Sequence, residues 1–248
     1  MIDGMNTDNS PPVKLPVPLK YASLFLGGGS LVYFFCFLIL GPRVSICLTS
    51  DPASALIANI GLSLLFFIQH SLMVRRAFKK RAARYLPERF EPAVYAIVSG
   101  LTLTLVVLFW QHSDMVFLIL PVWLKPVQGL MVLICLAGFL WASRSLDSLD
   151  PMGIRPRRQS RPGQPILKIA GPYQYVRHPM YFFTLVLIWS TTVFTLDRLV
   201  FNLLWTAWIC AGARWEERDL VRLFGRDYCD YQSAVPMLLP VKPRLKDR

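Results

Sequence analysis

Residues 21–40 read YASLFLGGGSLVYFFCFLIL, a stretch without a single charged side chain. A helix of this length crosses about 30 Å, which is the thickness of the hydrocarbon core of a bilayer. Further apolar runs lie at about 53–73, 93–110, 122–143, 179–196 and 199–213. The pattern predicts an all-α fold, a polytopic membrane helix bundle with about six transmembrane helices. The last two runs are short, so we expect them to tilt little or to enter the bilayer only part-way.

The composition agrees with a membrane protein. Of 248 residues, 54% are hydrophobic and 17% are charged, and the mean hydropathy is +0.43. A soluble domain of this length would be less apolar and more charged. We expect a flexible cytoplasmic tail over residues 1–17, a single integral membrane domain over 18–240 and a basic tail over 241–248. The five cysteines lack the spacing of a zinc site or of a disulfide framework, so no metal is expected.

The basic residues gather in alternate loops. Of 27 lysines and arginines, 24 fall in the N-terminal segment, in 75–91, in 144–178 and in 214–248. Only Arg43, Lys125 and Arg198 lie in the other loops. By the positive-inside rule, both termini and the two long loops face the cytoplasm, and the short loops favour the inner membrane of a bacterium. We expect the basic patches to meet lipid phosphates rather than nucleic acid.

Residues 171–181 read GPYQYVRHPMY and place polar groups where a charged loop meets an apolar run. Pro179 suits the first turn of a helix, so His178 would sit at the helix cap, beside backbone N–H groups that favour anions. The tyrosines add aromatic faces and hydroxyls. A ligand with a carboxylate, an adenine and hydroxyls would find a partner for each. The alternative is a membrane-helix start in which Arg177 snorkels and the tyrosines belong to the interfacial belt.

A second polar cluster, Glu216-Glu217-Arg218-Asp219-Leu220, begins 35 residues after Tyr181. Two apolar runs separate the clusters, and a hairpin of two membrane helices would return both to the same membrane face. Carboxylates at the end of an apolar run are unfavourable without a partner, which favours a pocket for a cationic ligand group. The alternative is a solvated helix face on which neighbouring arginines balance the two glutamates.

His70 interrupts an apolar run shortly before the basic loop that begins at Arg75. An ionisable residue at membrane depth is a functional candidate. The alternative is a structural histidine that is hydrogen-bonded across helices. Membrane depth and side-chain type make His70 the candidate base or substrate-orienting group, and make Arg75 and Arg177 candidate sources of positive potential.

The two clusters together follow the pattern G-x-Y-x-x-x-R-H-P-x-Y, a helical hairpin, and E-E-x-x-L-x-x-x-F-G-x-x-Y-x-x-Y-x-x-x-V-P. This pattern resembles the membrane-embedded methyltransferases of the isoprenylcysteine carboxyl methyltransferase and phospholipid methyltransferase superfamily. The segment Gln69-His70-Ser71-Leu72-Met73 and the ending Val235-Pro236-Met237-Leu238-Leu239-Pro240 resemble one branch of it. That branch contains methanethiol S-methyltransferase and NnrU-type membrane proteins. The resemblance covers most of residues 60–240.

The resemblance implies S-adenosylmethionine as cofactor, bound beside a C-terminal helical hairpin and a juxtamembrane helix. The residues implied to bind it are Ile166, Leu167, Lys168, Tyr173, His178, Pro179, Met180, Tyr181, Glu216 and Glu217. The catalytic candidates are His70 and Arg177. The substrate candidates are His70, Arg75 and Arg214, of which Arg214 lies near the place of a substrate-binding arginine in the prenylcysteine enzymes.

The implied reaction is methylation of methanethiol or a similar small thiol, giving dimethyl sulfide. One alternative is methylation of a lipid-borne acceptor, such as a prenylcysteine carboxylate or a phospholipid amine. Another is a non-enzymatic, NnrU-like membrane protein, which failure to bind S-adenosylmethionine would favour. The paired clusters at 177–178 and 216–217 argue against this last alternative. The expected partners are a small-molecule thiol and the bilayer, and the sequence does not indicate an oligomeric state.

Overall fold

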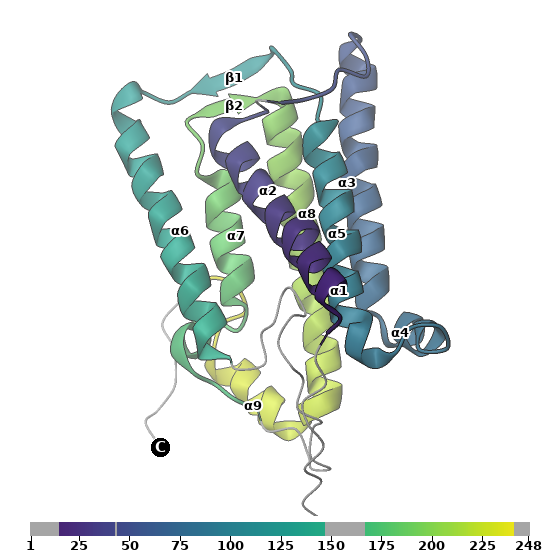
Figure 1. The fold of residues 1–248 in the computed structure, drawn as a ribbon. Helices are drawn as coiled ribbons and strands as arrows, with labels where there is room; N and C mark the ends of the chain where they lie inside the picture. Colours follow the sequence, from purple (N-terminus) through teal and green to yellow (C-terminus); the bar gives the residue numbers. More distant parts are fainter. Residues whose placement is uncertain (1–14, 43, 147–166, 241–248) are drawn as a thin grey trace, which may run out of the picture.

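The computed structural model describes residues 15–42, 44–146 and 167–240, so most of the expected N-terminal tail and all of the C-terminal tail lie outside it (Figure 1). Long helices run side by side between two ends of the molecule. The elements are α1 (Val17–Ala22), η1 (Ser23–Gly28), α2 (Gly29–Leu40), α3 (Pro52–Val74), α4 (Arg76–Ala82), η2 (Glu88–Phe90), α5 (Glu91–Leu108), β1 (Val116–Ile119), η3 (Val122–Leu124), α6 (Lys125–Ser145), η4 (Gly171–Gln174), α7 (Pro179–Trp189), β2 (Val193–Thr195), α8 (Leu196–Phe224) and α9 (Arg226–Ala234).

Four helical stretches of the described chain are long and apolar enough to cross a membrane: Val17–Leu40, Pro52–Val74, Glu91–Leu108 and Val122–Ser145. They support the expected membrane helix bundle, but six spans are not confirmed. Helix α7 has only 11 residues, which rise about 16 Å, roughly half of the hydrocarbon thickness. Helix α8 has 29 residues, but the buried charged side chains of Asp197 and Arg198 occupy its first turn.

A small antiparallel sheet, which was not predicted, accompanies the helices. Strand β1 pairs with β2, with Val116 opposite Thr195. Both strands are short runs of β-branched and aromatic residues, which favour strands. Strand β2 falls inside the apolar run predicted at 179–196, and β1 lies between two predicted runs, so hydropathy alone identified neither strand. The sheet joins the loop between α5 and α6 to the loop between α7 and α8 (Figure 1). Strand β2 follows the short helix α7 in the chain.

Aromatic side chains fill the centre of the bundle. The ring of Trp205 on α8 lies 5.0 Å from that of Phe34 on α2, 5.3 Å from that of Phe66 on α3 and 4.7 Å from that of Phe201 (centroid to centroid). Such ring pairs add stabilisation beyond the burial of their area. Helix α8 is therefore anchored centrally, with α2 and α3 packed around it.

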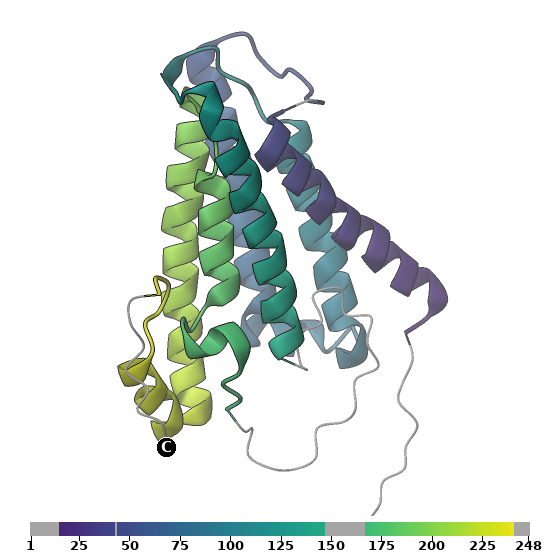
Figure 2. The same cartoon turned by 90° about the vertical axis from the view of Figure 1, so that its left-hand side faces the viewer.

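The first apolar segment contains a run of three glycines, Gly27–Gly29. A Cβ at Gly27 would lie 3.1 Å from the carbonyl oxygen of Ala96 on α5. A Cβ at Gly100 would lie 2.2 Å from the carbonyl oxygen of Leu26. Small residues on both sides thus allow backbone contact where the helices meet. Figure 2 shows that α1 and α2 slant away from α6 toward one end of the bundle.

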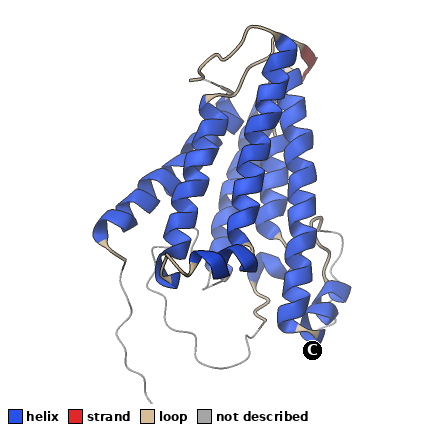
Figure 3. Ribbon diagram, turned by 90° about the vertical axis from the view of Figure 1, so that its right-hand side faces the viewer, coloured by secondary structure: helices blue, strands red, loops and turns tan. Residues whose placement is uncertain are grey.

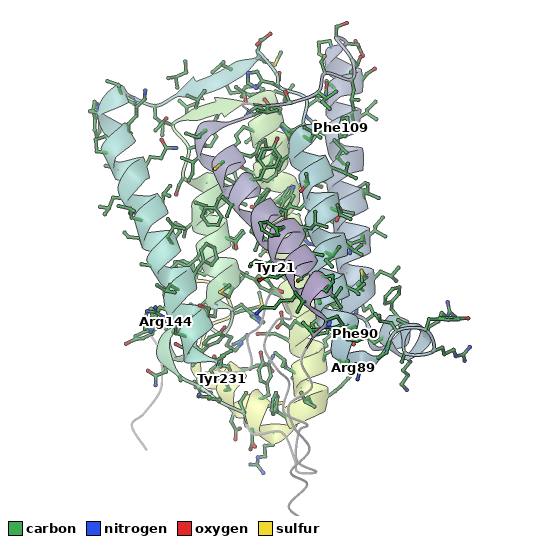
Figure 4. The ribbon with its side chains drawn as sticks, in the orientation of Figure 1. Tyr21, Arg89, Phe90, Phe109, Arg144 and Tyr231 are labelled. Carbon is green, nitrogen blue, oxygen red and sulfur yellow. The ribbon has the colours of Figure 1, made fainter. Side chains whose placement is uncertain are left out.

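The two ends of the bundle differ in charge. Arg89, Arg144 and Tyr231 lie at one end, and Phe109 lies at the other (Figure 4). We call the first end the basic end; it comprises the described residues 74–91, 144–146, 167–178 and 214–240. Helix α4 projects from the bundle there and lies across it in Figure 3. Both polar clusters of the sequence belong to the basic end.

Candidate functional site

The chain enters α7 through a turn that requires glycine. Gly171 begins η4 with a φ of 58°, in the left-handed region that side chains disfavour. A Cβ at this position would also lie 2.0 Å from Ser145 Oγ at the end of α6. Pro179 is in the first turn of α7 and His178 is its N-cap residue, as the sequence predicted. The local sequence therefore fixes where His178 stands.

Arg177 ties the start of α7 to α8 and to the segment that follows α9. Its guanidinium donates to both carboxylate oxygens of Glu217, at 2.5 and 3.0 Å. It also donates to the carbonyl oxygens of Gln232, at 2.9 Å, and Val235. The side chains of Arg177 and Glu217 are 9% and 11% exposed. The two clusters that the hairpin was expected to bring together are thus in direct, nearly buried contact.

Glu217 accepts hydrogen bonds from several donors at once. Besides Arg177, its carboxylate accepts from Gln232 Nε2 at 3.0 Å and lies 3.3 Å from His178 Nε2. Burial alone would raise the pKa of Glu217, but the hydrogen bonds from His178 and Arg177 lower it to about 2. Glu217 is therefore a carboxylate at neutral pH, and it holds the His178 ring in one orientation.

Glu216, the preceding residue, has a different environment. Its side chain is 47% exposed, and its Oε2 accepts a hydrogen bond of 2.8 Å from the Tyr181 hydroxyl. The Tyr181 ring stacks on the His178 ring, with 5.4 Å between centroids. His178 Nδ1 lies 3.8 Å from Glu216. Tyr181, His178 and Glu216 thus form one polar wall between α7 and α8.

A cavity of about 430 Å³, the His178 cavity, lies on one side of this wall. Nearly all of the predicted cofactor residues line it, together with Arg177: Leu167, Lys168, Tyr173, His178, Pro179, Met180, Tyr181 and Glu216. Tyr228 and Tyr231 of α9 add aromatic surface. Burial, together with the charge of Glu216, raises the pKa of Tyr173 to about 12, so its hydroxyl remains a hydrogen-bond donor at neutral pH.

A second cavity of about 420 Å³, the His70 cavity, lies among α3, α5, α7 and α8. His70 and Arg75 line it, and the Tyr95 hydroxyl lies 2.8 Å from His70 Nε2. The Arg75 guanidinium lies 5.1 Å from the ring centroid of Trp215, which also lines the cavity. The two cavities have three lining residues in common: Tyr181, Glu216 and Leu220. They are therefore neighbours across the polar wall.

Two predicted residues of the described chain line neither cavity. Glu217 contacts Arg177 and His178 instead. Arg214 is exposed and donates to the carbonyl oxygen of Cys210, one turn earlier on its own helix. Ile166 lies outside the described residues.

Six aromatic lining residues were not predicted as site residues: Tyr95, Trp208, Trp215, Phe224, Tyr228 and Tyr231. Phe224, Tyr228 and Tyr231 belong to the C-terminal sequence pattern, which was the available signal for them. The other three reach the site through helix packing.

The fold and the site define a helical membrane protein with two adjoining cavities at the basic end of the bundle. Residues 59–217 match the sequence model of the family described as NnrU protein. This match covers more than half of the chain, which belongs to the NnrU family. The membership confirms the resemblance inferred from the sequence patterns.

Curated relatives extend the comparison. The chain is 35% identical over 200 residues to methanethiol S-methyltransferase 2 of Bradyrhizobium diazoefficiens, covering 77% of this chain and 75% of that protein. It is 34% identical to methanethiol S-methyltransferase of Pseudomonas deceptionensis, over 75% and 73% of the two chains. The corresponding protein of Mycobacterium tuberculosis is 28% identical over 89% of this chain and 97% of its own. No solved structure gives a significant match.

Proposed function

We propose that this protein is a membrane S-methyltransferase that transfers a methyl group from S-adenosylmethionine to methanethiol. The observation that carries the proposal is the pair of cavities that meet at Tyr181 and Glu216. Transfer between two bound molecules requires that the reacting atoms be held at near-attack distance in a site shielded from water. Relatives named methanethiol S-methyltransferase support this choice of acceptor.

The residues of the His178 cavity fit the chemical groups of S-adenosylmethionine. Its volume, about 430 Å³, falls in the range of about 300–1,000 Å³ that is usual for small-molecule sites. The backbone N–H groups of Met180 and Tyr181, in the first turn of α7, suit a carboxylate. The rings of Tyr173, Tyr228 and Tyr231 offer surfaces for an adenine. The Glu216 carboxylate, at the boundary with the second cavity, suits a positive sulfur.

Acceptor chemistry belongs to the His70 cavity. The bound cofactor supplies a methyl group on a positively charged sulfur, which leaves as a neutral thioether. The nucleophile is a thiolate, so the thiol must lose its proton, and we assign His70 as the base that takes it. The Tyr95 hydroxyl fixes the imidazole, and Arg75 contributes positive potential beside it. The acceptor sulfur then forms its bond to the methyl carbon as the bond to the donor sulfur breaks.

Arg177 and Glu217 act in this proposal as positioning residues. The acceptors of the Arg177 guanidinium are a carboxylate and two backbone carbonyls. This arrangement orients His178 through Glu217 and holds α9 against the His178 cavity. The placement of Arg214 does not support a role in either cavity.

The proposed location is the inner membrane of a bacterium, with the basic end in the cytoplasm. The sequence supports this orientation, because 24 of 27 lysines and arginines fall in the two tails and in alternate loops, and the described parts of those loops belong to the basic end. Both cavities then open on the side where the cofactor would be available.

The test is methyl transfer from labelled S-adenosylmethionine by the purified protein in detergent. The acceptors offered are methanethiol, a prenylcysteine and a phosphatidylethanolamine. We expect volatile labelled product from methanethiol, lost in Glu216→Gln and His178→Ala. The matched control is Glu91→Gln, because Glu91 pairs with Lys79 at the basic end but lines neither cavity. Label in a lipid-soluble product would favour a lipid-borne acceptor, and absence of cofactor binding would favour a non-enzymatic protein.

A further inference from the structure

We propose that the His70 cavity accepts neutral, apolar thiols much larger than methanethiol. The inference rests on the proposed function and defines its substrate class. A liquid water occupies about 30 Å³, so methanethiol, whose methyl group and sulfur are each larger than a water, fills roughly two to three times that volume. The cavity measures about 420 Å³. Methanethiol would leave most of it empty, and a ligand that fills so little of its site is held by few contacts.

The free volume lies against α8. Gly212 lines the cavity, and a Cβ built on it would have no neighbour within 4 Å. Trp208 and Ile209, one turn before Gly212 on α8, line the cavity with apolar side chains, whereas the carboxylates of Glu216 and Asp219 lie one to two turns after it. A thiol whose sulfur faces His70 would therefore extend its hydrocarbon part along this wall.

The rim of the cavity is apolar and partly exposed. Val74 is 49% exposed, Trp215 is 38% exposed and Leu223 is 45% exposed. Val74 is the last residue of an apolar stretch long enough to cross a membrane. A bilayer crossed by this stretch would end near Val74, so the cavity would lie at the cytoplasmic boundary of the bilayer. Apolar thiols partition into the bilayer and would reach the sulfur site from that side.

The charges of the cavity favour a neutral acceptor over an anionic one. Its described lining includes two carboxylates, Glu216 and Asp219, of which Asp219 pairs with the exposed Arg222, beside one guanidinium, Arg75. That guanidinium is stacked over Trp215. A mercaptocarboxylate would have to place its charge near Glu216 and Asp219. The chemistry of transfer is the same as for methanethiol: the thiol gives its proton to His70, and its sulfur takes the methyl group to give an alkyl methyl thioether.

The test is kcat/KM for straight-chain thiols from methanethiol to hexanethiol, whose sulfhydryl acidities are nearly equal. Each buried methylene should raise kcat/KM by about fourfold through at least butanethiol. Gly212→Phe fills the free volume, and we expect it to lower the ratio of hexanethiol to methanethiol turnover by at least tenfold. Gly212→Ala should lower it less. The matched control is Gly61→Phe on α3. A Cβ at Gly61 also has no neighbour within 4 Å, and Gly61 lines neither cavity.

The outcomes separate the two proposals. Turnover of methanethiol with a steady decline from ethanethiol onward would overturn this inference and leave the proposed function standing. Cofactor binding without turnover of any thiol would overturn both. A ratio unaffected by Gly212→Phe in a folded, active protein would also overturn the inference, because the long thiols would then occupy a different space.

Discussion

Replacing Arg177 by methionine should destabilise the protein strongly. The substitution removes the four hydrogen bonds of the guanidinium, two of them to the Glu217 carboxylate. Glu217, 11% exposed, would keep only its contacts with His178 and Gln232. Removing one partner of a buried pair costs about 3–5 kcal/mol, because the other charge remains buried. We expect a loss of that size, and a raised KM for S-adenosylmethionine because His178 loses its orientation.

The measurement is unfolding in detergent, followed by tryptophan fluorescence, in a double-mutant cycle with Glu217→Leu. The double mutant should lose no more free energy of unfolding than Arg177→Met alone. This result corresponds to a coupling energy between the two residues of about 3 kcal/mol or more. The control is Arg222→Met, because Arg222 pairs with Asp219 at 3.3 Å with both side chains exposed. Such a pair contributes about 0.5 kcal/mol or less. Additive losses, or equal losses for Arg177→Met and the control, would refute the assigned role.

Three further predictions concern stability, each read from melting temperatures in detergent. Gly171→Ala combines a φ of 58° with a clash against α6, so it should cost more than the strain of about 1–3 kcal/mol alone; Gly41→Ala, with a φ of 74° and open space around it, should show only the strain. The higher stability of wild type over Glu217→Gln should be complete above pH 4.5 and disappear as the pH falls toward 2. Folding lowers the pKa of Glu217 from 4.5 to about 2, so the unfolded chain takes up the proton first. A stability difference that does not change between pH 6 and 3 would contradict this. Asn202→Leu should be neutral or stabilising, because the buried amide of Asn202 has no hydrogen-bond partner within the described residues, whereas Asn59→Leu, which removes two hydrogen bonds, should be destabilising.

The pattern around residues 171–181 allowed the basic end of the fold to be predicted in some detail. Proline placement located the start of α7, and the length of the two apolar runs implied a hairpin that returns to the same end. The hairpin placed both clusters at the same end, but the pairing of Arg177 with Glu217 was not predicted. Local rules sufficed here because one turn and one hairpin connect the two clusters.

The composition of the His70 cavity was harder to predict. The contact between His70 and Tyr95 joins α3 to α5 and depends on how two membrane helices rotate against each other. Apolar residues surround these helices on most faces, so their periodicity does not define the inner face. Trp208 and Trp215 were equally compatible with lipid contact. The sequence therefore did not indicate the site residues whose positions depend on helix packing.

Adjacent glutamates serve two different purposes in this fold. Consecutive residues of a helix point about 100° apart, so Glu216 and Glu217 have different main partners, although His178 lies between them, 3.8 Å from Glu216 and 3.3 Å from Glu217. Glu217 faces Arg177 and fixes α8 against the start of α7. That contact determines the distance between α7 and α8, and hence allows the hydrogen bond of 2.8 Å between Tyr181 and Glu216. The polar wall that both cavities share thus depends on the buried ion pair of Arg177 and Glu217, although Glu217 itself lines neither cavity. This explains why two acidic residues are needed where the proposed chemistry uses one.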